Sequence, residues 1–208
     1  MAWGRIVRSA IRHALGDHHT YEFIEGSVAC EAAPGLSSLT HSDDEFFRYI
    51  DPAAVIESGR SALADLEALI HDAGPFDGIL AFSEGAGLAA SLLIHRARLD
   101  AASGASQPLI KCAVFFSGGV PKDPETGRLM SFDEDGQVID IPTAHIWGRN
   151  DDLYPTFGPV LSKLCKPEAS ESFVHEGGHE IPGARDVEAI RSCVAVIRKT
   201  LELATIFC

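Results

Sequence analysis

A serine between small residues, at the end of an apolar run, is the first place where this chain could carry out chemistry. Ser83 follows the apolar residues 78–82, with Ala81 two positions before it and Gly85 two positions after it. In a sharp turn from a strand into a helix, such a serine is lifted above the sheet edge, and its neighbours must be small because the two backbones nearly touch. The pattern predicts a nucleophile, although a turn with an incidental serine has the same pentapeptide.

Two later apolar runs also end in residues with catalytic side chains. Asp151 and Asp152 come shortly after residues 142–147, and His179 comes shortly after residues 171–174. The carboxyl ends of parallel strands lie on one edge of a sheet, where such proteins place their sites. We therefore expect these side chains and the serine to face one cleft.

These residue types fit nucleophilic acyl transfer. A serine hydroxyl needs a base within hydrogen-bonding distance, and imidazole suits neutral pH, while a carboxylate fixes the imidazole tautomer. We predict Ser83 as nucleophile, His179 as general base and acid, and Asp151 as the orienting carboxylate, with Asp152 poorly separated from it by spacing alone. The backbone N–H of Glu84, at the start of a helix, is the predicted oxyanion donor. The order Ser, Asp, His is that of α/β-hydrolases.

A zinc site is the rival interpretation of the last segment. Residues 175–179 read His-Glu-Gly-Gly-His, which fits the H-E-x-x-H pattern of zinc proteases. That pattern works on a helix, where both imidazoles face one metal ion. Two central glycines and the nearby Pro182 disfavour a helix. The sequence therefore favours a serine hydrolase that needs neither a metal nor another cofactor.

Strands and helices are predicted to alternate along the chain. Apolar residues at helical spacing predict helices, and short apolar runs predict strands. Helices are expected over residues 3–15, 55–70, 84–99, 156–165 and 187–201. Strands are expected over residues 20–25, 78–82, 110–116, 142–147 and 171–174. This order predicts a mostly parallel sheet with helices on both faces. We expect one α/β domain over residues 1–208, with long loops at 27–51 and 120–141 as candidate substrate covers.

The composition and charge of the chain limit the classes of molecule that it could bind and the compartment in which it works. The chain has 208 residues, 46% of them hydrophobic and 23% charged, which is typical of a globular domain. A formal net charge of −13 disfavours nucleic acids and anionic membranes, and an acidic carrier protein would need a local basic patch to dock. The apolar runs are too short to span a bilayer, and no secretory signal is expected. Five cysteines without a C-x-x-C pair argue against a disulfide framework and predict a cytoplasmic protein. His145, inside a strand, is predicted to be a satisfied interior residue.

Segments across nearly the whole chain resemble the fungal serine hydrolase family of small α/β-hydrolases, which includes the lovastatin-type thioesterases of polyketide gene clusters. The matching segments are residues 16–26, 78–85, 116–119, 142–151 and 175–182. The resemblance implies a three-layer sandwich with a triad at Ser83, Asp151 and His179. The family's segment of a glycine, two residues and an aspartate matches residues 148–151, which favours Asp151 over Asp152.

The resemblance also implies an activity. Relatives hydrolyse carboxylic esters or thioesters through an acyl-enzyme, and some release a polyketide from a carrier domain of its synthase. They typically begin with a strand and a Leu-His-Gly loop that supplies a second oxyanion donor, whereas this chain begins about where their first helix would be. The resemblance thus implies an N-terminally shortened enzyme, with an impaired member that binds or scaffolds as the alternative. Phe46, Phe47 and Phe132, in the two long loops, would suit an apolar acyl chain.

Overall fold

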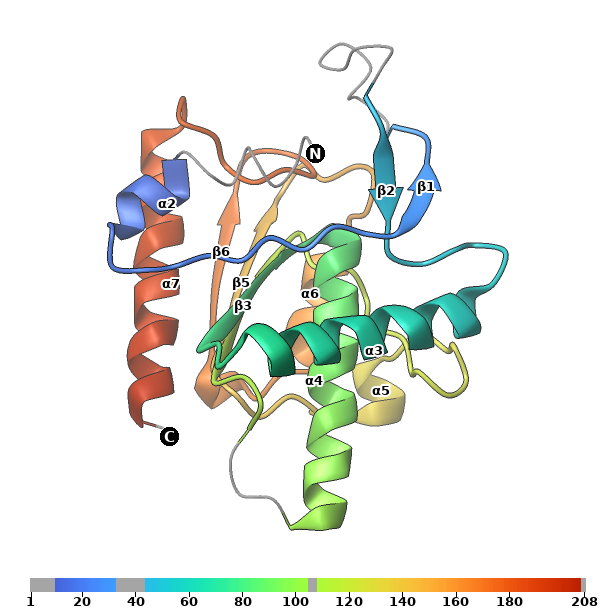
Figure 1. Ribbon diagram of the computed structural model, residues 1–208. Helices are drawn as coiled ribbons and strands as arrows, with labels where there is room; N and C mark the ends of the chain where they lie inside the picture. Colours follow the sequence, from blue (N-terminus) through green and yellow to red (C-terminus); the bar gives the residue numbers. More distant parts are fainter. Residues whose placement is uncertain (1–9, 33–43, 105–107, 207–208) are drawn as a thin grey trace.

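Four parallel strands form the centre of the computed structural model, which describes residues 10–32, 44–104 and 108–206 (Figure 1). The strands lie in the order β3, β4, β5, β6, and their bounds are Gly78–Phe82, Cys112–Phe116, Thr143–Gly148 and Ser170–His175. Phe82 is paired with Phe116, and Gly148 with His175. The carboxyl ends of all four strands therefore lie on one edge, and the predicted parallel sheet is confirmed.

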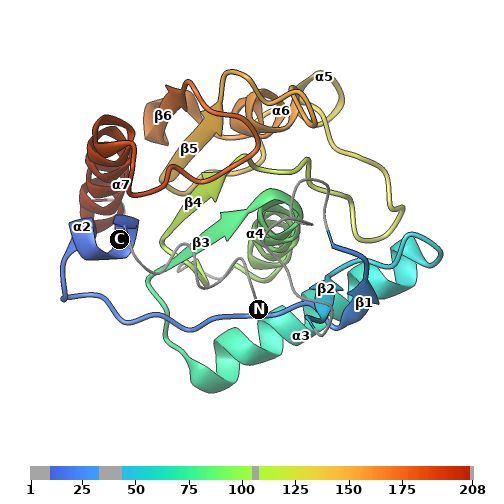
Figure 2. The same ribbon diagram turned by 90° about the horizontal axis from the view of Figure 1, so that it is seen from above.

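Helices cover both faces of the sheet, as Figure 2 shows from above. On one face α2 (Ala10–Leu15) packs on α7 (Val187–Ile206), and α7 packs on β4, β5 and β6. On the other face α4 (Ser83–Ser103) packs on β3 and β4, with α3 (Val55–Ala73) outside it and α6 (Phe157–Lys163) against β5. The result is the three-layer sandwich that the sequence predicts. Within the described ranges, no helix combines the length and apolar character required to cross a membrane.

The core lies in two layers because side chains of a strand alternate between faces. On β4, Phe115 belongs to the layer under α4, and Phe116 belongs to the layer under α7. All five residues of β4 are buried, which explains why its sequence is a continuous apolar run. Residues 86–94 of α4 are also buried throughout, so the helix that follows Ser83 is anchored along its first half.

The N-terminal segment differs from the prediction. Residues 20–25 are extended but form no ladder with any described strand, so the predicted strand is wrong. The segment is held by side chains instead, because the Arg12 guanidinium lies 4.6 Å from the centre of the Tyr21 ring, and Tyr21 stacks on Phe23. The helix predicted over residues 3–15 is helical from Ala10, and residues 3–9 lie outside the described part.

The loop predicted at 27–51 contains two strands. β1 (Val28–Cys30) and β2 (Phe46–Arg48) pair antiparallel, with Val28 opposite Arg48. Each strand has three residues, which is too short for a period of two to be recognised in a sequence. Residues 33–43 of this segment lie outside the described part.

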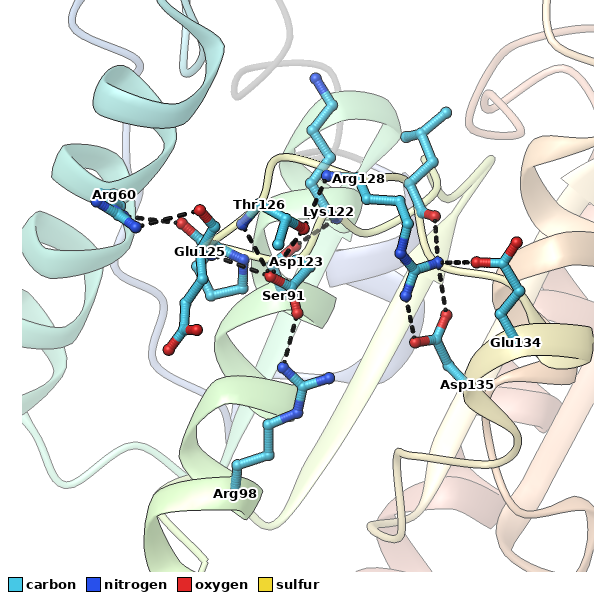
Figure 3. Close-up of polar contacts among 12 residues, drawn as sticks. Arg60, Ser91, Arg98, Lys122, Asp123, Glu125, Thr126, Arg128, Glu134 and Asp135 are labelled. Carbon is cyan, nitrogen blue, oxygen red and sulfur yellow. Dashed lines mark hydrogen bonds and ion pairs between the residues drawn. The ribbon is translucent and has the colours of Figure 1, made fainter.

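The second long loop, 120–141, is fastened to the helices beside it (Figure 3). The Asp123 carboxylate accepts hydrogen bonds from the backbone N–H groups of Glu125 and Thr126, and from Arg98 on α4 at 2.8 Å. The hydrogen bond from Arg98 holds the pKa of Asp123 well below its ordinary value. Arg60 on α3 donates to the carbonyl oxygen of Glu125 at 3.2 Å. The loop also contains a short helix, α5 (Phe132–Asp135).

His145 is buried between the sheet and its helices, and only one of its ring nitrogens has a partner. Nε2 lies 3.1 Å from the Thr143 hydroxyl, whereas Nδ1 is buried without a hydrogen bond. The residue is therefore interior, as predicted, but it is not fully satisfied. Burial lowers the pKa of His145 to about 3, because the charged imidazolium would lose its hydration.

We predict that this imidazole makes the fold sensitive to acid. The unfolded chain takes up a proton at His145 near pH 6.5, and the folded chain does so only near pH 3, so stability falls as the pH falls between these values. Between pH 7 and pH 5 this should cost about 2 kcal/mol. Urea unfolding of the wild type and His145→Leu should show that the variant lacks this loss.

His71→Leu on the exposed surface of α3 is the matched control, and its profile should run parallel to that of the wild type. Parallel profiles for the wild type and His145→Leu would contradict the prediction, because they would mean that the folded state accommodates a proton on His145.

Candidate active site

Ser83 stands in a tight turn between β3 and α4. Its φ is +52°, in the left-handed region that residues other than glycine rarely adopt. Gly119, which follows β4, packs against this turn and donates its backbone N–H to the Ser83 carbonyl oxygen at 2.9 Å. A Cβ on Gly119 would lie 2.7 Å from that oxygen, so a larger residue would push the turn out of place.

The glycine two positions after the serine has a different neighbour from the one we expected. A Cβ on Gly85 would lie 3.3 Å from the ring of Tyr49, which follows β2. The expected reason for a small residue was close approach of the strand and helix backbones. At Gly85 the structure shows that an aromatic side chain from another segment occupies the space.

The structure brings Ser83, His179 and Asp151 into one row of hydrogen bonds. His179 Nε2 lies 2.8 Å from Ser83 Oγ, and Nδ1 lies 2.6 Å from Asp151 Oδ2. Because an ionised carboxylate only accepts, Nδ1–H donates to Asp151 and Nε2 is left to accept from the serine hydroxyl. The side chains of His179 and Asp151 are 9% and 4% exposed, so water competes little for these bonds.

Asp151 and Asp152 differ sharply in position. The Asp151 carboxylate also accepts the backbone N–H of Tyr154 at 2.8 Å, which fixes its orientation. Asp152 is exposed, and its backbone N–H donates to the carbonyl oxygen of Asn150. Geometry therefore separates two candidates that spacing left open.

The loops after β5 and β6 are tied to each other. The backbone N–H of Asn150 donates to the Gly177 carbonyl at 3.0 Å, and its side-chain amide donates to the Glu176 carbonyl at 2.6 Å. A Cβ on Gly148 would overlap the carbonyl oxygen of Gly178, so the loops can approach this closely only with glycine there. This contact fixes Asp151 relative to His179.

Aromatic rings surround the imidazole. The rings of Phe82 and Tyr154 have their centres 5.0 and 4.8 Å from the centre of His179, and Phe157 lies edge-on at 6.4 Å. These rings lower the local dielectric and strengthen the hydrogen bonds of the row. Tyr154 and Phe157 could not be recognised from the sequence, because each contacts a histidine more than twenty positions further along the chain.

The two histidines of the H-E-x-x-H pattern are used separately. His175 ends β6, and its Nδ1 accepts the backbone N–H of Gly177 at 3.1 Å. Both ring nitrogens of His179 are engaged by Ser83 and Asp151. In the part of the chain that the structure describes, no three His, Cys, Asp or Glu side chains gather in a way that could hold a metal ion.

Glu84 follows Ser83 in the first turn of α4, where backbone N–H groups have no partner within the helix. Its side chain makes contacts that the sequence did not indicate. Oε1 accepts from Arg48 Nη2 at 2.9 Å, and Oε2 accepts from the backbone N–H of Tyr49 at 2.8 Å. The β1–β2 pair is thereby attached to the residue next to Ser83.

The three phenylalanines expected to contact substrate do not lie together. Phe46 and Phe47 are on β2, near the start of α4, and Phe47 is exposed. Phe132 is exposed on α5, which lies on the other side of α4 from β2 when the molecule is viewed from above (Figure 2). Phe46 and Phe47 are consecutive on β2, so their side chains point to opposite faces. Contact of any of the three with substrate stays a prediction.

Comparison with known proteins agrees with this geometry. The family model described as Serine hydrolase (FSH1) matches residues 7–189. Esterase FPY3 of Fusarium mangiferae is 33% identical over 206 residues, which cover 95% of this chain and 90% of that protein. Hydrolase phiM of Talaromyces stipitatus is 31% identical over 188 residues, which cover 86% of this chain and 73% of that protein.

A solved structure supports the fold. The crystal structure of a "predicted CIB-like hydrolase" from Thermoplasma acidophilum matches with a TM-score of 0.50 and 14% identity, over 74% of this chain and 66% of that chain. At this identity the likeness concerns the fold alone. The family match covers most of the sequence, and the sheet has the expected parallel order. The chain has the α/β-hydrolase fold and belongs to the serine hydrolase (FSH1) family.

Proposed function

We propose that this protein cleaves a carboxylic ester or thioester through an acyl-enzyme. Ser83 is the nucleophile, His179 the general base and acid, and Asp151 the carboxylate that orients the imidazole. The observation that carries this proposal is the row of bonds from Ser83 Oγ to His179 Nε2 at 2.8 Å and from Nδ1 to Asp151 Oδ2 at 2.6 Å.

In the proposed reaction, His179 Nε2 takes the hydroxyl proton as Ser83 Oγ attacks the substrate carbonyl carbon. Asp151 stabilises the imidazolium without taking its proton. The backbone N–H of Glu84 donates to the oxyanion. His179 then protonates the leaving alcohol or thiol, and in the second half it activates a water molecule that releases the acid from Ser83.

The acyl group and its carrier form the finer part of the proposal. We infer an apolar acyl chain, supported by an aromatic side chain of β2, either Phe46 or Phe47, since the two point to opposite faces of the strand. The resemblance to lovastatin-type thioesterases supports a polyketide delivered as a carrier-bound thioester. The odd number of cysteines without a C-x-x-C pair supports a cytoplasmic setting. Because the chain carries a net charge of −13, an acidic carrier domain would have to dock on a local basic surface.

We expect a fluorophosphonate probe to label the wild type and to leave Ser83→Ala unlabelled. A panel of acyl esters and matched acyl thioesters of several chain lengths should be hydrolysed by the wild type, with losses of at least about 10³-fold in Ser83→Ala and His179→Ala. The ester-to-thioester ratio in kcat/KM identifies the leaving group. A folded wild type that is not labelled, under conditions that label esterase FPY3, would favour an impaired protein with a binding or scaffold role.

The neighbouring aspartates provide a matched pair of variants. Asp151→Asn should lower kcat by about 10³- to 10⁴-fold, because its amide N–H would face Nδ1 and favour the wrong imidazole tautomer. Asp152→Asn, on the exposed neighbour, should stay within about 2-fold of the wild type. The measurement is kcat of both variants and the wild type on one ester. Equal losses of kcat in the two variants would contradict the assignment of Asp151 as the orienting carboxylate.

A further inference from the structure

The residue that supplies the proposed oxyanion donor carries a negative charge of its own. Glu84 offers its backbone N–H to the reaction, and its carboxylate lies on the same residue. Negative charge develops on the substrate oxygen in the transition state, so a nearby unpaired carboxylate would oppose it. A partner that compensates the charge of Glu84 would therefore favour the reaction proposed above.

Arg48 is the cation that meets this carboxylate. Its Nη2 lies 2.9 Å from Glu84 Oε1, and the two side chains are 39% and 32% exposed. The hydrogen bond to Glu84 is the main reason why the pKa of Arg48 is raised. Partial burial means that salt and water screen this pair less than they screen a fully exposed one.

The position of Arg48 is fixed by its backbone surroundings. A Cβ on Gly26 would overlap the Arg48 carbonyl group, so the N-terminal segment packs tightly against this residue. The next residue, Tyr49, donates its backbone N–H to Glu84 and its hydroxyl to the Ile24 carbonyl at 2.9 Å. The cation is thus held beside the first turn of α4 by several contacts besides the ion pair.

We propose that Arg48 is a positioning residue that acts through Glu84, neutralising its carboxylate so that the oxyanion forms in a favourable potential. This inference rests on the proposed function. It differs from a purely mechanical attachment of the β1–β2 pair, which would need a hydrogen bond but no positive charge. The two roles can be separated because glutamine at position 48 can donate an N–H without carrying charge.

Arg48→Gln should lower kcat by about 10- to 100-fold with little change in KM, because an uncompensated carboxylate near the oxyanion raises the barrier. Arg48→Lys keeps the charge and should stay within about 5-fold of the wild type. In the double variant Arg48→Gln with Glu84→Gln, both charges are removed and kcat should return to within about 5-fold of the wild type. The rate of fluorophosphonate labelling should follow the same order.

Arg98→Gln is the matched control, since it removes an arginine–carboxylate pair of 2.8 Å with Asp123, in the 120–141 loop (Figure 3). Its kcat should equal that of the wild type within about 2-fold. Raising the salt concentration to about 1 M should partly reduce the loss of kcat in Arg48→Gln, because added ions screen the half-buried Glu84 carboxylate in part. Thermal unfolding of every variant reports separately on the attachment of the β1–β2 pair.

The inference is overturned if Arg48→Gln turns over like the wild type, or if the double variant is as slow as Arg48→Gln. Should Arg48→Gln fail to fold, the double variant still decides, because a mechanical attachment predicts an inactive enzyme and charge compensation predicts an active one. A wild type that is neither labelled nor active overturns the proposed function instead, which keeps the two failures distinguishable.

Discussion

The backbone at Ser83 is held in a left-handed conformation, with φ at +52°, and the rest of the site is arranged around this turn. Such a conformation costs about 1–3 kcal/mol for a residue with a side chain, so its surroundings must impose it. β3 precedes the turn within the sheet, and the buried first half of α4 follows it. Gly119 holds the turn from the end of β4, because its backbone N–H donates a hydrogen bond to the Ser83 carbonyl oxygen. Ser83 can therefore present its hydroxyl without freedom to relax.

The sheet order creates a second requirement. β3 and β6 are the two outer strands of the four, so His179 must reach Ser83 across the ends of β4 and β5. Small residues at these ends leave the space. Gly119 follows β4, and a Cβ there would lie 2.7 Å from the Ser83 carbonyl oxygen. Gly148 ends β5 where the loop after β6 passes over it. The row of hydrogen bonds thus depends on glycines that take no part in the proposed chemistry.

The sequence was informative for buried strands, for long helices and for the residues at strand ends. The buried strands and long helices are recognisable by their apolar patterns, and the polar residues that follow β3, β5 and β6 could be placed on one edge before any contact was known. Contacts between segments that are distant in the sequence could not be recognised from residue patterns. Glu84 and Arg48 lie 36 positions apart, and neither residue type identifies the other as its partner. The alternation of Tyr21 and Phe23 resembles a strand but serves stacking with Arg12.

Pairing also explains how an acidic protein could support a reaction with an anionic transition state. The chain has a net charge of −13, and at physiological salt an exposed charge is largely screened beyond about 8 Å. Carboxylates close to the proposed reaction centre matter most, and Asp151 and Glu84 each have a partner that the structure shows. Asp151 is bound by His179 and by the Tyr154 N–H, so in the proposed reaction its charge would stabilise the imidazolium. Glu84 is bound by Arg48, so its charge is balanced at the point where negative charge is proposed to develop.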